Sequence, residues 1–266
     1  MKKRGIEFMT VVGLALGVGA VLGAMHFKHV PLSAFKNEAA LLVIFAGTFA
    51  SVLNAFPGRD LKNIGKLFMG VFTSDKANPL GTIKQVVAIA ETARREGVLA
   101  IEQKLESIDN DFMKKGFQMV VDGSSEDYVE EVLESEIAEM EERHSINASI
   151  FSQAGAYAPT LGVLGAVFGL IAAMESIDEV DKMAEAVSAA FMATILGIFT
   201  GYVLWNPFAN KLKMKSKHEV QDMRIILEGI KAIQSGYSPN IIKEKLLGML
   251  PKSERAKYDS ARDSSE

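Results

Sequence analysis

The residues that are most able to take part in chemistry lie inside four long stretches that contain no Asp, Glu, Lys or Arg. The polar side chains within them include the hydroxyls of Thr160, Ser188, Thr194 and Thr200. A hydroxyl can hydrogen-bond water or a carboxylate, but it does not exchange a proton near neutral pH. The same stretches hold Pro159 and Pro207, and each proline removes a backbone donor from its helix.

No carboxylate lies inside any of these stretches. Ion-coupled membrane proteins usually place an ionisable group at depth. His26 lies at the outer edge of the first stretch, where we interpret it as an interfacial residue. Therefore either the chain moves no ions, or a partner chain supplies the acid.

The length of the uncharged stretches predicts four transmembrane helices. The stretches are Phe8 to Phe27, Ala39 to Phe56, Ser145 to Met174 and Ala186 to Asn210. A spanning helix needs roughly 20 predominantly apolar residues, and buried core helices rarely stay uncharged over such lengths. Lys2, Lys3 and Arg4 before the first stretch also fit a signal peptide. Because the run is longer than a usual signal core and three spans follow, we predict a retained helix.

Basic residues in the short flanks predict that both termini are cytoplasmic. These flanks hold Lys2, Lys3, Arg4, Arg59, Lys62, Lys66, Lys211, Lys213, Lys215 and Lys217. The connection between spans three and four has only Lys182, whereas Lys28 and Lys36 between spans one and two give a weaker, opposite signal. The predicted fold class is an all-α membrane protein with four transmembrane helices and a helical cytoplasmic domain.

This organisation divides the chain into four parts. Residues 1–56 are a transmembrane hairpin with spans at about 8–27 and 39–56, and residues 57–149 are a cytoplasmic helical domain. Residues 150–206 are a second hairpin with spans at about 150–174 and 186–206. Residues 207–266 supply C-terminal helices and a tail that is predicted to be disordered, because it is charged and poor in apolar residues.

Helical signals run through the cytoplasmic parts. A helix is predicted from Asn78-Pro79 to a stop at Gly97. Ser124 with Asp127 resembles a capping box and predicts the start of a long helix that continues into the third span. Its apolar stripe is Val129, Leu133, Ile137, Met140 and His144.

Composition excludes several classes of protein. The net charge of −4 and a pI near 5.7 give no electrostatic case for nucleic-acid binding. The absence of Cys excludes a disulfide-stapled module, thiolate catalysis and Cys-based metal sites. Glycines in the first span do not form a dinucleotide fingerprint and follow no predicted strand. Without a nucleophile–base–orienter set or metal spacing, we predict no enzyme activity, no catalytic residue, no metal and no cofactor.

Several motifs then point to one family. They are the runs Ala158 to Val167 (Ala-Pro-Thr-Leu-Gly-Val-Leu-Gly-Ala-Val), Ala189 to Gly197, Asn206-Pro207-Phe208 and Ala93 to Gly97. With these motifs in this order, nearly the whole chain resembles the MotA/TolQ/ExbB proton channel family, and in particular its flagellar stator members. The resemblance implies a homopentamer, embedded in lipid of the bacterial inner membrane, around a MotB-like single-span protein. In the family that partner carries the essential intramembrane Asp, which fits the missing carboxylate.

The resemblance also implies that the second hairpin, residues 150–206, lines the ion path, and it implies roles for residues of the third and fourth uncharged stretches. Pro159 and Pro207 match the prolines that link ion flow to conformational change, and Thr194 matches the threonine that lines the ion path. From the residues alone, Pro207 could equally end a helix beside an interfacial Trp205. Sodium-driven relatives tend to carry Thr where this chain has Ala166, so the predicted ion is the proton.

Arg94 and Glu102 match the family's charged pair that engages the rotor protein FliG. As alternatives, Arg94 could favour a helix C-terminus and Glu102 could belong to a solvated face. Neighbouring Arg95 and Glu96 leave the assignment of the rotor contact open.

Two other functions compete with that of a stator subunit. An ExbB- or TolQ-like energiser of an envelope transport system usually has three spans, so the extra hairpin at residues 8–56 favours the stator. A passive membrane scaffold would use the same Pro and Gly residues for packing alone.

Overall fold

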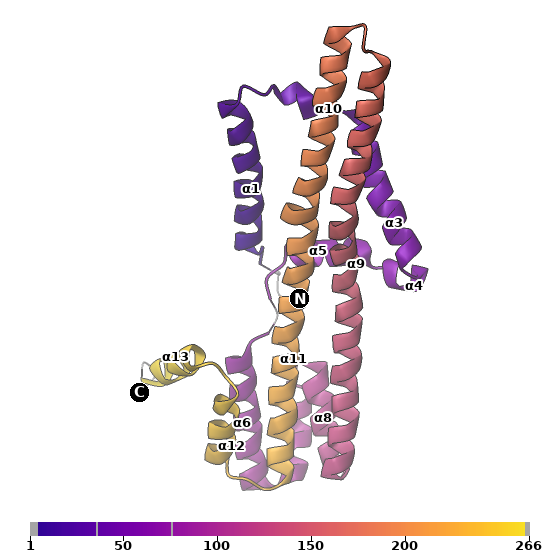
Figure 1. Ribbon diagram of the computed structural model, residues 1–266. Helices are drawn as coiled ribbons and strands as arrows, with labels where there is room; N and C mark the ends of the chain where they lie inside the picture. The colour runs from indigo at the N-terminus through magenta and orange to yellow at the C-terminus, as the bar shows by residue number, and fades with distance from the viewer. Residues whose placement is uncertain (1–4, 36, 76, 264–266) are drawn as a thin grey trace. The chain divides into compact units, whose positions relative to one another are not determined.

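The computed structural model describes residues 5–35, 37–75 and 77–263 (Figure 1). Among these residues the regular elements are all helices, and the one isolated bridge pairs Ile6 with Thr73. The basic residues Lys2, Lys3, Arg4 and Lys36, which contribute to the predicted orientation, lie outside the described residues. The chain forms two compact units, one from residues 1–75 and 144–214 and the other from residues 76–143 and 215–266.

The first unit contains the four candidate membrane spans. In chain order its main helical segments are α1 (Phe8–Phe27), α2 (Glu38–Leu41) with η2 (Leu42–Ala46) and α3 (Gly47–Ala55), the end of α9 (Glu126–Glu175), α10 (Val180–Phe199), η4 (Thr200–Trp205) and the start of α11 (Asn206–Gln234). Both η2 and η4 are π-helical, and each lies within a continuous helical run. The predicted all-α membrane fold with four spans is confirmed.

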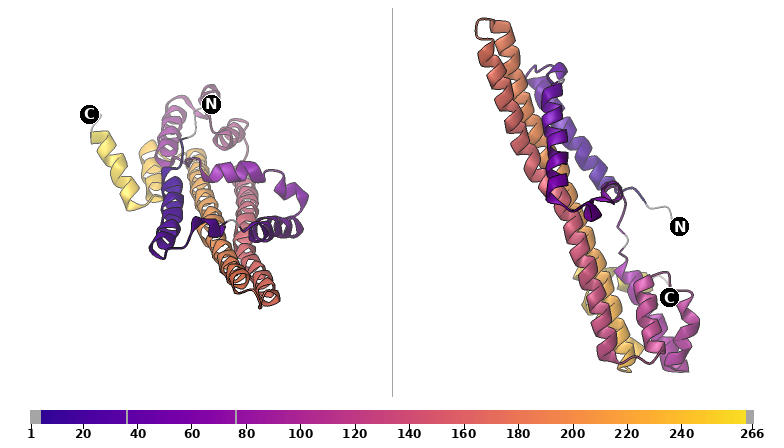
Figure 2. Two further views of the ribbon diagram at one scale, coloured as in Figure 1. Left: turned by 90° about the horizontal axis from the view of Figure 1, so that it is seen from above. Right: turned by 90° about the vertical axis from the view of Figure 1, so that its right-hand side faces the viewer.

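The spans expose an apolar surface. In α1 only Met25 is buried, whereas Phe8 and Leu16 are each 69% exposed. α9 and α10 form an antiparallel hairpin, and the views in Figure 2 agree that they lie side by side. Exposed apolar side chains of this density are expected in a helix that faces lipid or a partner helix, because neither presents water to it.

Two short helices, α4 (Gly58–Leu61) and α5 (Ile64–Val71), belong to the first unit. The segment after α5 pairs with the segment before α1, since the amide of Glu7 donates to the carbonyl of Phe72 at 2.8 Å. Residues 57–75 therefore group with the spans, although the sequence places the cytoplasmic domain from residue 57.

The second unit is a helical body around one hydrophobic core. Its elements are α6 (Pro79–Glu96), η3 (Val98–Ile101), α7 (Glu102–Leu105), α8 (Asp111–Val121), the start of α9, the rest of α11, α12 (Pro239–Gly248) and α13 (Lys252–Asp263). The predicted stripe of α9 is confirmed, since Val129, Leu133, Ile137 and Met140 are buried in this core, while His144 is half-buried and falls in the other unit. At its edge Lys231 pairs with Glu130, and that hydrogen bond raises the pKa of Lys231.

Helix caps define both ends of α6 and the start of α9 in the second unit. Asn78 accepts a hydrogen bond from the amide of Gly81, and Gly97 ends α6 at a φ of 90°, so both predicted ends are confirmed. The predicted cap of α9 is wrong by one residue: Ser125, not Ser124, accepts from the amide of Tyr128 at 3.3 Å.

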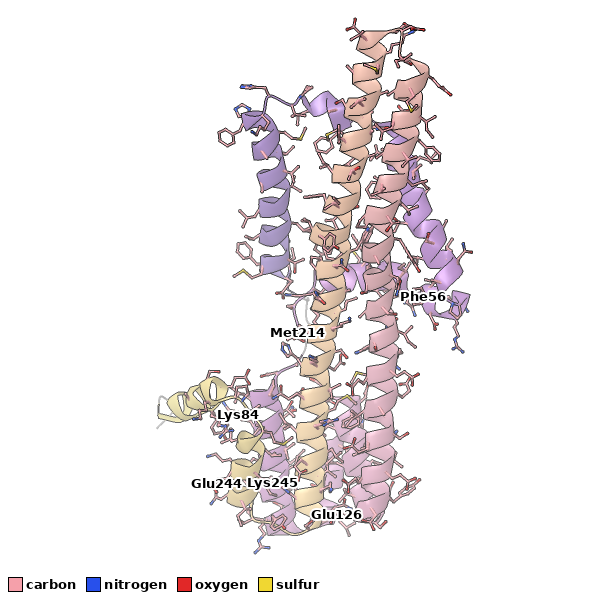
Figure 3. All side chains as sticks on the ribbon, viewed as in Figure 1. Phe56, Lys84, Glu126, Met214, Glu244 and Lys245 are labelled. Carbon is pink, nitrogen blue, oxygen red and sulfur yellow. The ribbon has the colours of Figure 1, made fainter. Side chains whose placement is uncertain are left out.

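The C-terminal tail differs from the predicted disorder, because Lys252–Asp263 form α13. Arg255 donates to the carbonyls of Leu250 and Gly248 at 2.7 Å each. The ammonium groups of Lys84, labelled in Figure 3, and Lys243 lie 5.7 and 5.0 Å from the ring centroid of Tyr258. These contacts fix the start of a segment whose low hydrophobicity alone predicts no packing.

Candidate ion path and coupling site

The hairpin of α9 and α10 is held together by glycines that face each other. A Cβ built on Gly197 would lie 2.7 Å from the Cα of Gly162 and 2.8 Å from the carbonyl oxygen of Ala158. One built on Gly169 would lie 2.9 Å from the Cβ of Ala190. The helix backbones touch at these levels, so no larger residue fits. Such contacts replace the hydrophobic drive that lipid does not provide.

Pro159, on α9, lies where α9 contacts the helix of span four. Its ring packs on Gly201 of η4, because a Cβ on Gly201 would lie 2.7 Å from the Cγ of Pro159 and 2.8 Å from the Gly155 carbonyl oxygen. Since Pro159 has no N–H, that Gly155 carbonyl loses its intrahelical donor. The π-helical turn of span four therefore packs directly against the turn of span three that lacks this backbone hydrogen bond. π-Helical turns of this kind are frequently found at functional sites.

Ala166 and Thr194 lie on the same hairpin. Both are half-buried, and the Thr194 hydroxyl donates to the carbonyl of Ala190 at 3.4 Å. A Cβ on Gly165 would lie 3.4 Å from the Cβ of Ala193, so the residues after Gly165 and Ala193 are at similar heights. The hairpin thus brings Ala166 and Thr194 to similar levels, whereas Pro159 packs at the level of Gly201, about two helical turns away.

Thr200 is a buried hydroxyl at the first residue of η4, for which the sequence suggested no role. It is 3% exposed and donates toward the carbonyls of Leu196 at 2.8 Å and Gly197 at 3.1 Å. A threonine that bonds back to the preceding turn competes with the regular helix ladder. The signal for it was present in the sequence as a Thr-Gly pair seven residues before Pro207.

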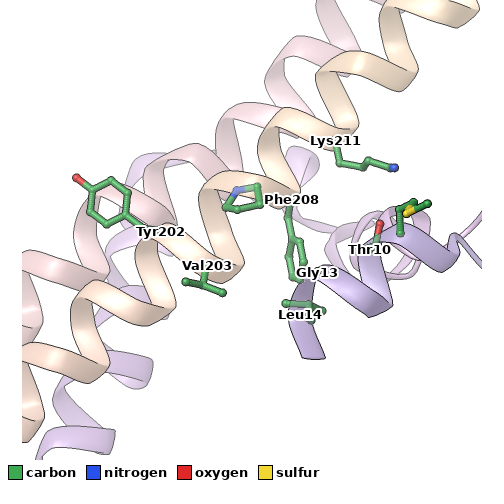
Figure 4. Close-up of a pocket in the computed structure, with 9 residues that line it drawn as sticks. Thr10, Gly13, Leu14, Tyr202, Val203, Phe208 and Lys211 are labelled. Atoms are coloured by element: carbon green, nitrogen blue, oxygen red, sulfur yellow. The ribbon is translucent and has the colours of Figure 1, made fainter. Parts of the chain in front are cut away.

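Pro207 lies apart from Pro159, Ala166 and Thr194. It is exposed and lines a groove between α1 and the junction of η4 with α11, as Figure 4 shows. The helix continues through it, so the alternative that Pro207 ends a helix is wrong. Trp205 is half-buried and stacks on Phe151 with ring centroids 6.2 Å apart, in a cluster of aromatic side chains. It also contacts Phe208 edge-on, with ring centroids 6.3 Å apart.

Arg94 and Glu102 belong to the second unit. Arg94 lies in the last turn of α6 and Glu102 is the first residue of α7, with η3 between them. Both side chains are exposed, and so are Arg95 and Glu96. Gly97 turns the chain between these positions with its positive φ. The geometry gives an accessible charged surface around this turn.

Comparison with known proteins identifies the family of this chain. The model of the MotA/TolQ/ExbB proton channel family matches residues 104–225. The Motility protein A of Bacillus subtilis is 46% identical over 253 residues, which are 94% of this chain and 93% of that protein. The chain belongs to the MotA/TolQ/ExbB proton channel family. The predicted family is thereby confirmed, and a proton channel family agrees with the prediction that the chain is not an enzyme.

Other members of the MotA/TolQ/ExbB family are similar over nearly their whole length. Chemotaxis protein PomA of Vibrio alginolyticus is 31% identical over 94% of this chain and 98% of that protein. The flagellar MotAB stator complex of Bacillus subtilis contains a chain that is 46% identical, with a TM-score of 0.88 over 93% of this chain and 98% of that one. A chain of MotAB from C. jejuni has a TM-score of 0.85 at 30% identity, over 92% of this chain and 96% of that one. The protein is a multi-pass membrane protein of this family.

Proposed function

We infer that this chain is the stator subunit of a bacterial flagellar motor and couples ion flow to rotation. The observation that carries this inference is the similarity to the MotAB stator structure along 93% of this chain. The sequence adds a specific requirement, because none of the four spans has a carboxylate in its interior. A MotB-like single-span partner would supply the intramembrane Asp, inside a homopentamer in the bacterial inner membrane.

The hairpin suggests how a ring of subunits without an interior carboxylate responds when the partner's Asp is protonated. Protonation neutralises the partner's Asp, which changes the contacts that it prefers along Pro159, Ala166 and Thr194. A step needs only a difference in interaction free energy between the charged and the neutral acid. The membrane potential contributes about 2.3 kcal/mol per charge per 100 mV. The π-helical turn at Gly201 is the element that we assign to the resulting movement.

Proton coupling is the first expected property. Ala166 has no hydroxyl that could replace part of the hydration shell of sodium, so swimming should persist in sodium-free medium and stop on addition of a protonophore. Swimming speed of a strain that depends on this chain measures both effects. Speed that follows external sodium and ignores the protonophore would show that the ion is wrong.

The exposed charges around Gly97 are proposed to push the rotor protein FliG. Arg94→Gln should reduce swimming partially, because one exposed ion pair contributes only about 0–1 kcal/mol. Arg94→Glu and Glu102→Arg should reduce it much more, since each reversal replaces an attraction with a repulsion. Lys114→Glu, a reversal at an exposed residue of α8, is the control. Swimming of Arg94→Glu at the speed of this control would remove Arg94 from the rotor contact.

A further inference from the structure

The groove that Pro207 lines has the shape of a site for an amphipathic ligand. It encloses about 400 Å³ between the first turns of α1 and the region where η4 joins α11 (Figure 4). Met9, Thr10 and Gly13 line one side, and Tyr202, Pro207 and Lys211 line the other. Ligand pockets in proteins generally fall between roughly 300 and 1,000 Å³.

One end of the groove is closed and the other is open. A Cβ on Gly17 would lie 2.7 Å from the Cγ1 of Val203, so α1 and η4 touch at that level. One turn earlier, a Cβ on Gly13 would meet nothing within 4 Å. The two helices therefore diverge toward the start of α1, where Thr10 and Lys211 line the open end (Figure 4). This divergence leaves open space beside Gly13, on the groove that an apolar chain would occupy.

The open end carries one positive and one negative group. Glu7 immediately precedes the first uncharged stretch, and Lys211 immediately follows the fourth. Their side chains form an ion pair of 2.6 Å and are only 22% and 30% exposed. This pair therefore lies where two spans leave the bilayer, directly beside an apolar groove. The hydroxyl-bearing Thr10 also lines this region.

We propose that this groove binds a phospholipid with a primary ammonium headgroup, a phosphatidylethanolamine. One acyl chain lies over Gly13 against the ring of Pro207. The headgroup phosphate accepts hydrogen bonds from Lys211, and its ammonium donates to Glu7.

The charge of the pair selects this headgroup over the other common ones. A purely anionic headgroup would compete for Lys211 and be repelled by Glu7. A choline headgroup carries no N–H and cannot donate to the Glu7 carboxylate. A zwitterion with phosphate and ammonium satisfies both charges, and charge-assisted hydrogen bonds of this kind are among the stronger ones.

The lipid site stands on this geometry alone, whereas its effect on the motor rests on the proposed function. An acyl chain against Pro207 fills the space into which α1 and α11 would otherwise close. The bound lipid would then be a part of the coupling machinery at the second proline.

The headgroup test uses the full chain, purified from bacterial membranes with whatever subunits accompany it. Native mass spectrometry and lipid extraction give the retained lipids relative to the bulk membrane. Phosphatidylethanolamine should be enriched, and Lys211→Gln should reduce its retention about fivefold, as expected for the loss of one charge-assisted hydrogen bond. Lys213→Gln, which changes an exposed lysine outside the groove, should retain the wild-type amount. Glu7→Gln should shift the preference toward phosphatidylglycerol, because Lys211 then lacks its carboxylate.

A second pair of variants tests the groove itself. Gly13→Leu places a side chain in the open space and should exclude the acyl chain. Gly19→Leu is the matched control, since a Cβ there also meets nothing within 4 Å but Gly19 does not line the groove. Equal lipid retention by both leucine variants would overturn the proposal.

The occupant can also be identified directly. A photoreactive amino acid at position 13 should form an adduct with the mass of a phospholipid. An adduct with a second copy of this chain or with a single-span partner would overturn the lipid site. Lipid retention and swimming are separate readouts, so a failed lipid site leaves the stator function untouched, and loss of the stator function leaves the lipid measurement valid.

Discussion

Pro159→Ala is expected to slow rotation about tenfold while the membrane complex still assembles. Alanine restores the N–H that proline lacks, so the carbonyl of Gly155 regains its helical partner. It also removes the ring that packs on Gly201, at the contact between span three and the π-helical turn. If the proline lowers the stepping barrier by about 1.4 kcal/mol, its loss reduces the stepping rate roughly tenfold.

Torque on a tethered cell or bead measures this loss, and the amount of complex in the membrane shows that assembly is retained. Pro251→Ala is the matched control, because that proline is exposed before α13 and lies outside the spans. The coupling role of Pro159 would be lost if Pro159→Ala generated wild-type torque. A complex that failed to assemble would assign Pro159 to packing and contradict this prediction equally.

Gly197→Val is expected to prevent the membrane hairpin from packing and so to remove the complex from the membrane. Even its Cβ would lie 2.7 Å from the Cα of Gly162 and 2.8 Å from the Ala158 carbonyl oxygen. Both obstacles are backbone atoms, which cannot rotate away as a side chain can. Overpacking costs about 1–3 kcal/mol where neighbours can adjust, and here the helices themselves must separate.

The midpoint of thermal unfolding of the purified complex, together with its yield, measures this effect. Gly23→Val on α1 is the control, because a Cβ there meets nothing within 4 Å. It should leave the midpoint and the yield close to those of the wild type. A Gly197→Val complex of normal yield and midpoint would show that the contact between Gly162 and Gly197 does not hold the hairpin.

The number of spans was predictable from the sequence. Charge is excluded from a bilayer core at a large free-energy cost, so the uncharged stretches mark the spans without reference to any neighbour. Local caps were also predictable without reference to distant residues, since Asn78 and Gly97 act within one turn of the chain. The cap of α9 was misplaced by one residue because Ser124 and Ser125 carry the same hydroxyl.

Order in the C-terminal tail was not predictable, because its first residues are fixed by contacts with residues far away in sequence. Tyr258 meets Lys84 across more than half of the chain. The composition of the tail shows its low hydrophobicity, but it does not show which distant residues pack against it.

The different surroundings of the two prolines are visible only in the tertiary structure. In the sequence each proline lies in an uncharged stretch, the third or the fourth, and the resemblance assigns them one task. The fold places Pro159 against Gly201, inside the hairpin, and Pro207 on an open groove beside α1. Sequence determines which residue breaks a helix ladder, since that loss is a property of the residue itself. Which neighbour faces the break depends on how distant helices pack, and only the tertiary structure decides it.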